Sequence, residues 1–311
     1  MYFPYLRGKQ FELLALRELA HLPLIGEKVS PVIEPLKLDT RAIITMVRSL
    51  PPSIRIHLII NPEHGEIRNG SRVIADLIRT LRQANYVNVT PTFIISANRD
   101  LILLQQVLEE YGFNESGYSL IHLNQIAGVT ALSELVARTN CLYNIIQVSH
   151  IIALRRNFPR PSLAFIADPF NRQLKNADYL HVDDENFSTD HQYYQDEGFV
   201  GFGDYLTIGS TFIDGGRLPW AVVIHLTYED HETRNVRIHH FVSDSNEDDS
   251  DTAGKFAEAL DKLIVFVNER GIESMAISAF QDLHARGGYP GLGTIKKLSI
   301  MHHIELIQSL I

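Results

Sequence analysis

The stretches PVIEPL at residues 31–36 and IHLIIN at residues 56–61 decide the fold. Both are short and mostly apolar, which is typical of strands that are buried on both faces of a parallel sheet. Residues 73–81 follow the second stretch with the periodicity of a helix that returns the chain to the start of the next strand. A strand followed by a returning helix is the unit of parallel α/β sheets.

The same signature recurs along the chain, with further helical segments at residues 100–111 and 130–138. We predict barrel strands at residues 31–36, 56–61, 90–96, 119–124, 143–150, 163–168, 199–206 and 220–226. Eight parallel strands are the number that a closed (β/α)₈ barrel requires. The sequence therefore predicts an α/β protein with a single (β/α)₈ TIM-like barrel.

The segments around these strands predict one domain over residues 1–311. Residues 1–30 form a leading segment with an amphipathic helix at residues 10–20, and the barrel strands occupy residues 31–226. Residues 227–311 form the C-terminal extension. Its expected elements are a hairpin strand outside the barrel at residues 236–242, the last barrel helix at 253–269 and a closing helix at 294–311.

Charge and cysteine content narrow the class of protein. The chain has 28 Lys and Arg residues against 37 Asp and Glu, a formal charge of −9, which argues against a general nucleic-acid-binding surface. Cys141 is the single cysteine, so neither a disulfide framework nor a thiolate metal site can form. Because no export signal or long apolar run stands out, we expect a cytoplasmic protein without a membrane segment.

The polar residues at the strand ends are the candidate site, because function in such barrels collects at the C-terminal ends of the strands. We predict Glu34, Asp168, Asp204 and His225 as catalytic residues on one arc of the barrel mouth. The predicted substrate-binding residues are Lys9, Lys37, Asn61, Asn124 and Tyr205.

Three interpretations of the acidic arc stay open. Carboxylate oxygens with one imidazole could bind Mg²⁺, Ca²⁺ or Mn²⁺, so a divalent metal is one expectation for an otherwise unknown cofactor. The same groups could act without a metal as general acid and base. They could also do no more than satisfy backbone amides at the strand ends. The HExxH, GxSxG and GxxxxGK[ST] motifs do not occur.

Two short motifs add to the candidate set. In GFGDY, at residues 201–205, the glycines beside Asp204 could allow a ligand to approach the backbone closely. His302 and His303 lie in a helical stretch, where successive residues are about 100° apart. We therefore expect one of these histidines to pack and the other to be exposed.

Four segments together resemble the Beta protein family of T-even phages and bacteria: YFPYLRGKQFELLALREL near the start, PVIEPLK, GFGDY, and MHHIELI near the end. The resemblance implies a barrel-like α/β domain, phage-related or mobile gene neighbourhoods, and a small companion protein encoded nearby. It implies no established reaction. The residues that match are Pro4, Lys9, Glu12, Glu34, Asp204, Tyr205, His302 and His303.

Two functional hypotheses follow. The first is a hydrolase, metal-dependent or not, that acts on a phosphate ester or a nucleotide-type substrate in a phage-related or defence context. A small phosphorylated ligand at an acidic mouth needs positive charge, which a metal or Lys9 and Lys37 would supply. The second is a non-catalytic binding or scaffold subunit whose activity resides in the companion protein.

Overall fold

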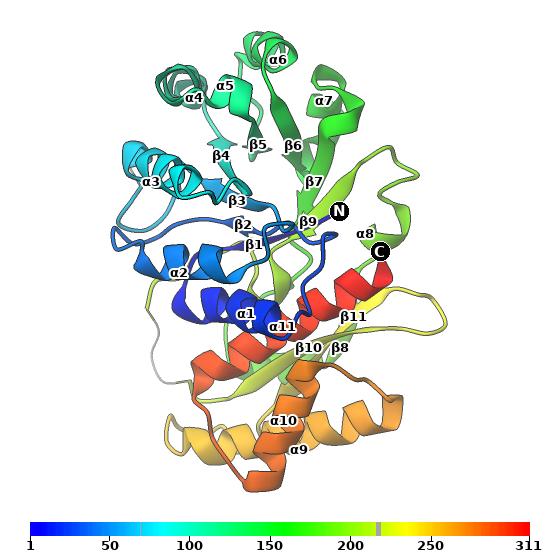
Figure 1. Ribbon diagram of the computed structural model, residues 1–311. Coiled ribbons are helices and arrows are strands. Elements are labelled where there is room, and N and C mark those ends of the chain that lie inside the picture. Colours follow the sequence, from blue (N-terminus) through cyan, green and yellow to red (C-terminus); the bar gives the residue numbers. More distant parts are fainter. Residues whose placement is uncertain (69, 216–218) are drawn as a thin grey trace.

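The computed structural model describes residues 1–68, 70–215 and 219–311. Eight parallel strands close into a barrel that is surrounded by helices (Figure 1), which confirms the predicted fold class. In order around the barrel, the strands are β1 (Tyr2–Leu6), β2 (Val32–Ile33), β3 (Ile56–Ile59), β4 (Val89–Ile95), β5 (Tyr118–His122), β6 (Cys141–Gln147), β7 (Leu163–Ala167) and β9 (Gly201–Asp204).

The strand that completes the barrel differs from the predicted one. β1 pairs in parallel with both β2 and β9 and so closes the barrel, whereas residues 2–6 were expected in a leading segment. All five of its residues are buried, as an all-apolar barrel strand should be. The predicted bounds of the leading segment and of the barrel strands are corrected accordingly, because the barrel strands span residues 2–204.

Residues 220–226, predicted as the eighth barrel strand, lie outside the barrel. They run into β10 (Val223–Glu229), which pairs antiparallel with β11 (Val236–Val242), and β11 pairs antiparallel with β8 (Asp184–Ser188). The hairpin predicted at 236–242 is therefore confirmed, but its partner is the strand that we had placed in the barrel. The apolar run WAVV resembles a fully buried parallel strand. β10 instead has buried and partly exposed residues, as expected for a strand of an antiparallel sheet.

Helices surround the barrel and cover the three-stranded sheet. The longer helices are α1 (Gln10–His21), α2 (Arg41–Ser49), α3 (Ser71–Gln83), α4 (Asn98–Tyr111), α6 (Val129–Arg138), α9 (Thr252–Arg270), α10 (Met275–Arg286) and α11 (Leu292–Leu310). The short ones are α5 (Phe113–Ser116), η1 (Val148–His150), α7 (Ile151–Leu154), η2 (Arg155–Asn157), η3 (Arg160–Ser162), η4 (Asn176–His181), α8 (Asp190–Tyr193) and η5 (Leu206–Ile208).

Helix α11 contacts both the barrel and the small sheet. Figure 1 shows α11 between the barrel and the small sheet, beside α1, and the contacts of α11 with α1 and β10 agree with this arrangement. α9 packs against β10 and β11, so the helix expected to be the last of the barrel covers the small sheet instead. None of the helices in the described ranges is long and apolar enough to cross a membrane.

Alternation along each barrel strand decides which side chains face the axis. The interior is an apolar cluster with contributions from every strand region: Phe3, Tyr5, Val32, Ile59, Ile94, Ile121, Ile145, Ala164, Ile166 and Tyr205. Where β9 meets β1, a Cβ atom on Gly203 would lie 2.3 Å from the backbone oxygen of Phe3. The glycine in GFGDY therefore allows close approach of β1, not of a ligand.

Candidate functional site

A cavity of about 340 Å³ occupies the C-terminal mouth of the barrel. The loops that follow the strands supply most of its wall, as the fold predicts. It is lined by Tyr5, Arg7, Glu34, Glu63, His64, Leu123, Asn124, Gln147, Ser149, His150, Tyr205 and Ser210. The strand-end rule therefore located the cavity correctly, although only some of the predicted residues line it.

Glu34 is the centre of the hydrogen-bond network at this mouth. Its carboxylate is 1% exposed, and Oε2 accepts a hydrogen bond of 3.0 Å from the Tyr5 hydroxyl. Oε1 accepts hydrogen bonds from the backbone N–H groups of Glu63, at 2.9 Å, and His64, at 3.2 Å. Burial, followed by the charge of Glu34, holds the pKa of Tyr5 well above its ordinary value, so this phenol stays a neutral donor.

The same carboxylate fixes the ring of His64. Nδ1 of His64 lies 3.0 Å from Oε1 of Glu34. An ionised carboxylate can only accept, so Nδ1 carries a proton in this contact, and Nε2 is the nitrogen left to accept one when the ring is neutral. About a third of this side chain is exposed, and no described residue hydrogen-bonds to Nε2. A buried carboxylate that orients a partly exposed imidazole is an arrangement suited to general acid–base chemistry.

Arg7 and the loop after β9 form the opposite wall. The Arg7 guanidinium donates to the carbonyl oxygen of Gly209 at 2.9 Å and to that of Ser210, while its Nε lies 3.9 Å from Oε2 of Glu34. Phe212, further along this loop, packs on His64 with ring centroids 4.6 Å apart. The guanidinium is thus used to hold the loop, and the loop in turn supports the imidazole.

Two predicted site residues also hold this loop. Lys9 donates from Nζ to the carbonyl oxygen of Ile213 at 2.7 Å, and Asp168 accepts a 2.9 Å hydrogen bond from the backbone N–H of Ser210. Neither side chain lines the mouth cavity. Asp168 therefore contacts the backbone of this loop and lines neither the mouth nor the outer cavity.

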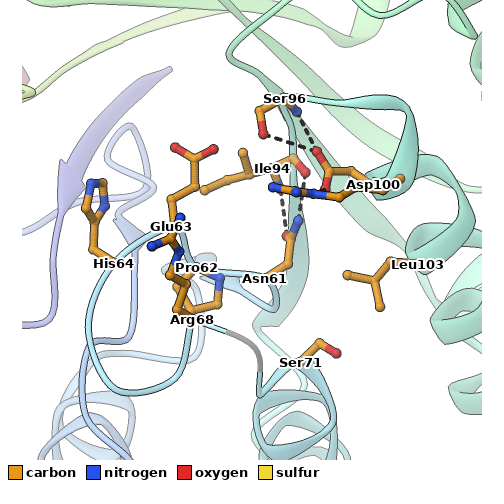
Figure 2. Close-up of a pocket in the computed structure, with 11 residues that line it drawn as sticks. Asn61, Pro62, Glu63, His64, Arg68, Ser71, Ile94, Ser96, Asp100 and Leu103 are labelled. Atoms are coloured by element: carbon orange, nitrogen blue, oxygen red, sulfur yellow. Dashed lines mark hydrogen bonds and ion pairs between the residues drawn. The ribbon is translucent and has the colours of Figure 1, made fainter.

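A second, larger cavity of about 840 Å³ adjoins the mouth and shares Glu63 and His64 with it. Figure 2 shows the loop after β3 on one side of this outer cavity and the segment that carries Ser96, Asp100 and Leu103 on the other. The amide of Asn61, a predicted substrate-binding group, hydrogen-bonds to both the N–H and the carbonyl oxygen of Ile94. Asn61 therefore lines the outer cavity, but both polar atoms of its amide are hydrogen-bonded to the backbone of Ile94.

Asp204 does not reach either cavity. Residues 204 and 205 alternate, so Tyr205 points to the barrel interior and the mouth while Asp204 points outward. There its carboxylate accepts a 2.7 Å hydrogen bond from the Tyr2 hydroxyl and lies 3.2 Å from Nε2 of His303. The predicted convergence of Asp204 with Glu34 was therefore wrong, because the residue of this pair that faces the mouth is Tyr205, one position further along the chain.

His225 is also remote from the mouth, because it lies on β10 of the small sheet. Its Nδ1 is 2.7 Å from Nδ1 of His240, and Phe170 and Tyr179 pack around the pair. Burial lowers the pKa of His225 well below its ordinary value, so the ring is neutral. The predicted arc of Asp168, Asp204, His225 and Glu34 therefore does not exist.

The remaining predicted residues are divided between the mouth and the surface. Asn124 and Tyr205 line the mouth cavity, whereas Lys37 is exposed and lines neither the mouth nor the outer cavity. Burial raises the pKa of Tyr205, so this phenol is a neutral hydrogen-bonding group.

The residues present do not fit the divalent-cation site that the sequence suggested. In the part of the chain that the structure describes, no three His, Cys, Asp or Glu side chains are close enough together to hold a metal ion. Both oxygens of Glu34 already accept hydrogen bonds from protein donors, and these donors compete with a metal ion for the same oxygens.

Among the mouth residues that sequence reasoning missed are Tyr5, Arg7, Glu63 and His64. Tyr5 and Arg7 were missed because β1 was taken for a leading segment. Glu63 and His64 follow the apolar run of residues 56–61 by two and three positions. Extending the strand-end search into the following loop would have found them, since βα loops carry function in this fold.

Comparison of the sequence with known protein families and with curated proteins found no match.

Proposed function

We propose that this protein is a cytoplasmic hydrolase of a small phosphate ester or nucleotide-type substrate, with His64 as the general acid and base and Glu34 as its positioning residue. The observation that supports the proposal most strongly is the 3.0 Å contact between Nδ1 of His64 and the buried Glu34 carboxylate, beside two connected cavities. The proposal retains metal-free general acid–base catalysis, which was one of the interpretations of the sequence, but assigns it to His64 and not to the predicted arc of strand-end residues.

The proposed reaction uses one imidazole twice. Nε2 of His64 takes a proton from a water molecule as the water oxygen attacks phosphorus, and Glu34 stabilises the imidazolium that forms. The bond from phosphorus to the leaving oxygen then breaks, and the imidazolium gives its proton to that oxygen. One water is consumed, an alcohol and a phosphate are released, and His64 returns to its neutral state.

The non-catalytic alternative, a binding or scaffold subunit, is favoured by one observation. Both oxygens of Glu34 are occupied by protein donors, so the mouth presents mostly neutral hydrogen-bonding groups around its most buried carboxylate. The resemblance to the Beta protein family supports a phage-related or defence setting for either function, and a companion protein as the partner in the second.

A hydrolysis assay separates the two candidates. The purified protein is tested with p-nitrophenyl phosphate, bis-p-nitrophenyl phosphate and thymidine 5′-(p-nitrophenyl phosphate), and we expect turnover of at least one of them. His64→Gln should then lower kcat by about 10²- to 10⁴-fold. His284→Gln is the matched control, because His284 also lies 3.0 Å from a carboxylate, that of Asp261, but lines neither the mouth nor the outer cavity.

Two outcomes would count against the hydrolase. No turnover of any of these esters by the wild-type protein would favour the binding subunit. Equal rates for wild type and His64→Gln would show that another group does the chemistry.

A further inference from the structure

The two cavities differ in the charge of their walls, and they meet at Glu63 and His64. A substrate whose reacting bond lies beside His64 would therefore have one part in the mouth and the other in the outer cavity. The charges on each side indicate which part goes where.

Two arginine side chains line the outer cavity. Arg68 lines it, and no described carboxylate lies within ion-pair distance of its guanidinium. Arg99 lines it too, with Nε 3.8 Å from Oδ1 of Asp100, a loose contact between an exposed and a buried side chain. The hydroxyl of Ser71 is a further donor on the same wall.

Two carboxylates line the same cavity: Glu63 lies where the two cavities meet, and Asp100 is satisfied by protein donors. Oδ2 of Asp100 accepts hydrogen bonds from the Ser96 N–H at 2.8 Å, the Ser96 hydroxyl at 3.1 Å and the Ala97 N–H at 2.7 Å. Figure 2 shows the Ser96 contacts of this carboxylate. Asp100 is therefore occupied at the start of α4, and Arg68 and Arg99 remain able to bind an anion.

The mouth offers no comparable cation. The Arg7 guanidinium is bound to two loop carbonyls and lies beside Glu34. Most of the remaining wall is neutral and carries hydroxyl or amide groups, from Tyr5, Tyr205, Ser149, Ser210, Asn124 and Gln147. Such a wall suits an uncharged polar group with several hydrogen-bonding atoms.

We infer that the outer cavity is the phosphoryl-binding half of the site, with Arg68 and Arg99 as its cations, and that the mouth binds the neutral alcohol that leaves. This inference rests on the proposed hydrolase function and adds to it the orientation of the substrate and the residues that bind its charge. Planar guanidinium groups bind phosphate oxygens by paired, charge-assisted hydrogen bonds. They also stabilise the charge on those oxygens as the leaving bond breaks.

Binding of inorganic phosphate, measured by isothermal titration calorimetry at low ionic strength, tests this assignment without any turnover. We expect Arg68→Gln/Arg99→Gln to weaken phosphate binding by at least about tenfold, because both charge-assisted contacts are lost. The control is Arg72→Gln/Arg79→Gln, which removes two charges from α3 whose side chains pair with Glu110 and Asp76. That control should change the affinity by less than about twofold, because both charges are already paired with carboxylates of the protein.

His64→Gln makes the test independent of the proposed reaction, because it should lower kcat by about 10²- to 10⁴-fold and keep phosphate binding. Unchanged phosphate affinity in Arg68→Gln/Arg99→Gln would overturn the inference and leave the role of His64 standing. Failure of the wild-type protein to bind phosphate at millimolar concentration would overturn it as well.

Discussion

Nε2 of His303 in α11 lies 3.2 Å from Oδ2 of Asp204 at the end of β9. Nδ1 of the same ring is 2.9 Å from Oγ1 of Thr227 on β10, and Oδ1 of Asp204 accepts from the Tyr2 hydroxyl on β1. The barrel, the small sheet and the closing helix are thus joined by one buried chain of polar contacts. These residues lie outside both cavities, so their contribution is to the fold.

Asp204→Ala should destabilise the protein by about 3 kcal/mol or more, because it leaves His303 and Tyr2 buried without their partner. Urea unfolding measures this loss. A change of less than 1 kcal/mol would mean that the contact contributes little to the fold.

Asp168→Ala should behave differently although both aspartates were predicted as catalytic. Asp168 is exposed and makes one hydrogen bond with the described residues, to the Ser210 N–H, so we expect a stability change within about 1 kcal/mol. Hydrogen exchange at the Ser210 amide should become faster, because its acceptor is removed. Exchange at the wild-type rate would contradict the role assigned to Asp168 in holding the loop.

Stability should fall in acid partly because of His302. Its Nε2 donates to the carbonyl oxygen of Thr227 at 2.7 Å, and burial lowers its pKa from 6.5 to about 4. The folded state therefore binds a proton less readily than the unfolded chain. The free energy of unfolding has its full value above pH 6.5 and falls as the pH drops towards 4, by up to about 3 kcal/mol from this group.

The comparison of wild type with His302→Gln isolates this effect. His57 and His122, whose pKa values burial lowers to about 3 and about 4, contribute in the same direction in both proteins. Urea midpoints between pH 7 and pH 4 should fall more steeply for the wild type. Parallel curves would show that His302 does not titrate with the predicted shift.

Gly203→Ala tests the packing of β9 against β1. The added Cβ would lie 2.3 Å from the backbone oxygen of Phe3, so the strands must separate, and we expect a loss of at least about 2 kcal/mol. Gly288→Ala is the control, since its nearest neighbour would be Leu283 Cδ2 at 3.6 Å. Equal thermal unfolding temperatures for the two variants would contradict the close approach described for Gly203.

The fold could be predicted from the sequence to the extent that buried parallel strands appear as short apolar runs. This signal located β2 to β7 and β9. The segments YFPYL and WAVVIHL carry it equally well, and we assigned the eighth strand to WAVVIHL, whereas YFPYL completes the barrel. Which of two apolar runs completes a barrel depends on long-range pairing, which the local pattern does not contain.

The position of the site could also be predicted from the strands, but the direction of each side chain could not. Glu34 and Asn124 follow barrel strands and line the mouth cavity, and the strand-end rule found both. Asp204 was misplaced because a one-residue change along a strand reverses the side that a residue faces. His64 lies in a loop, where no periodicity indicates the direction of a side chain.

The most direct test of the account is the protonation of the His64 ring, measured by ¹⁵N-edited NMR of the wild-type protein at neutral pH and assigned with His64→Gln. The contact with Glu34 predicts a proton on Nδ1, so that Nε2 is the nitrogen without a proton in the neutral ring. A proton on Nε2 with Nδ1 bare would contradict it, because the ring would then offer no base to the cavities and Glu34 could not be the group that positions it.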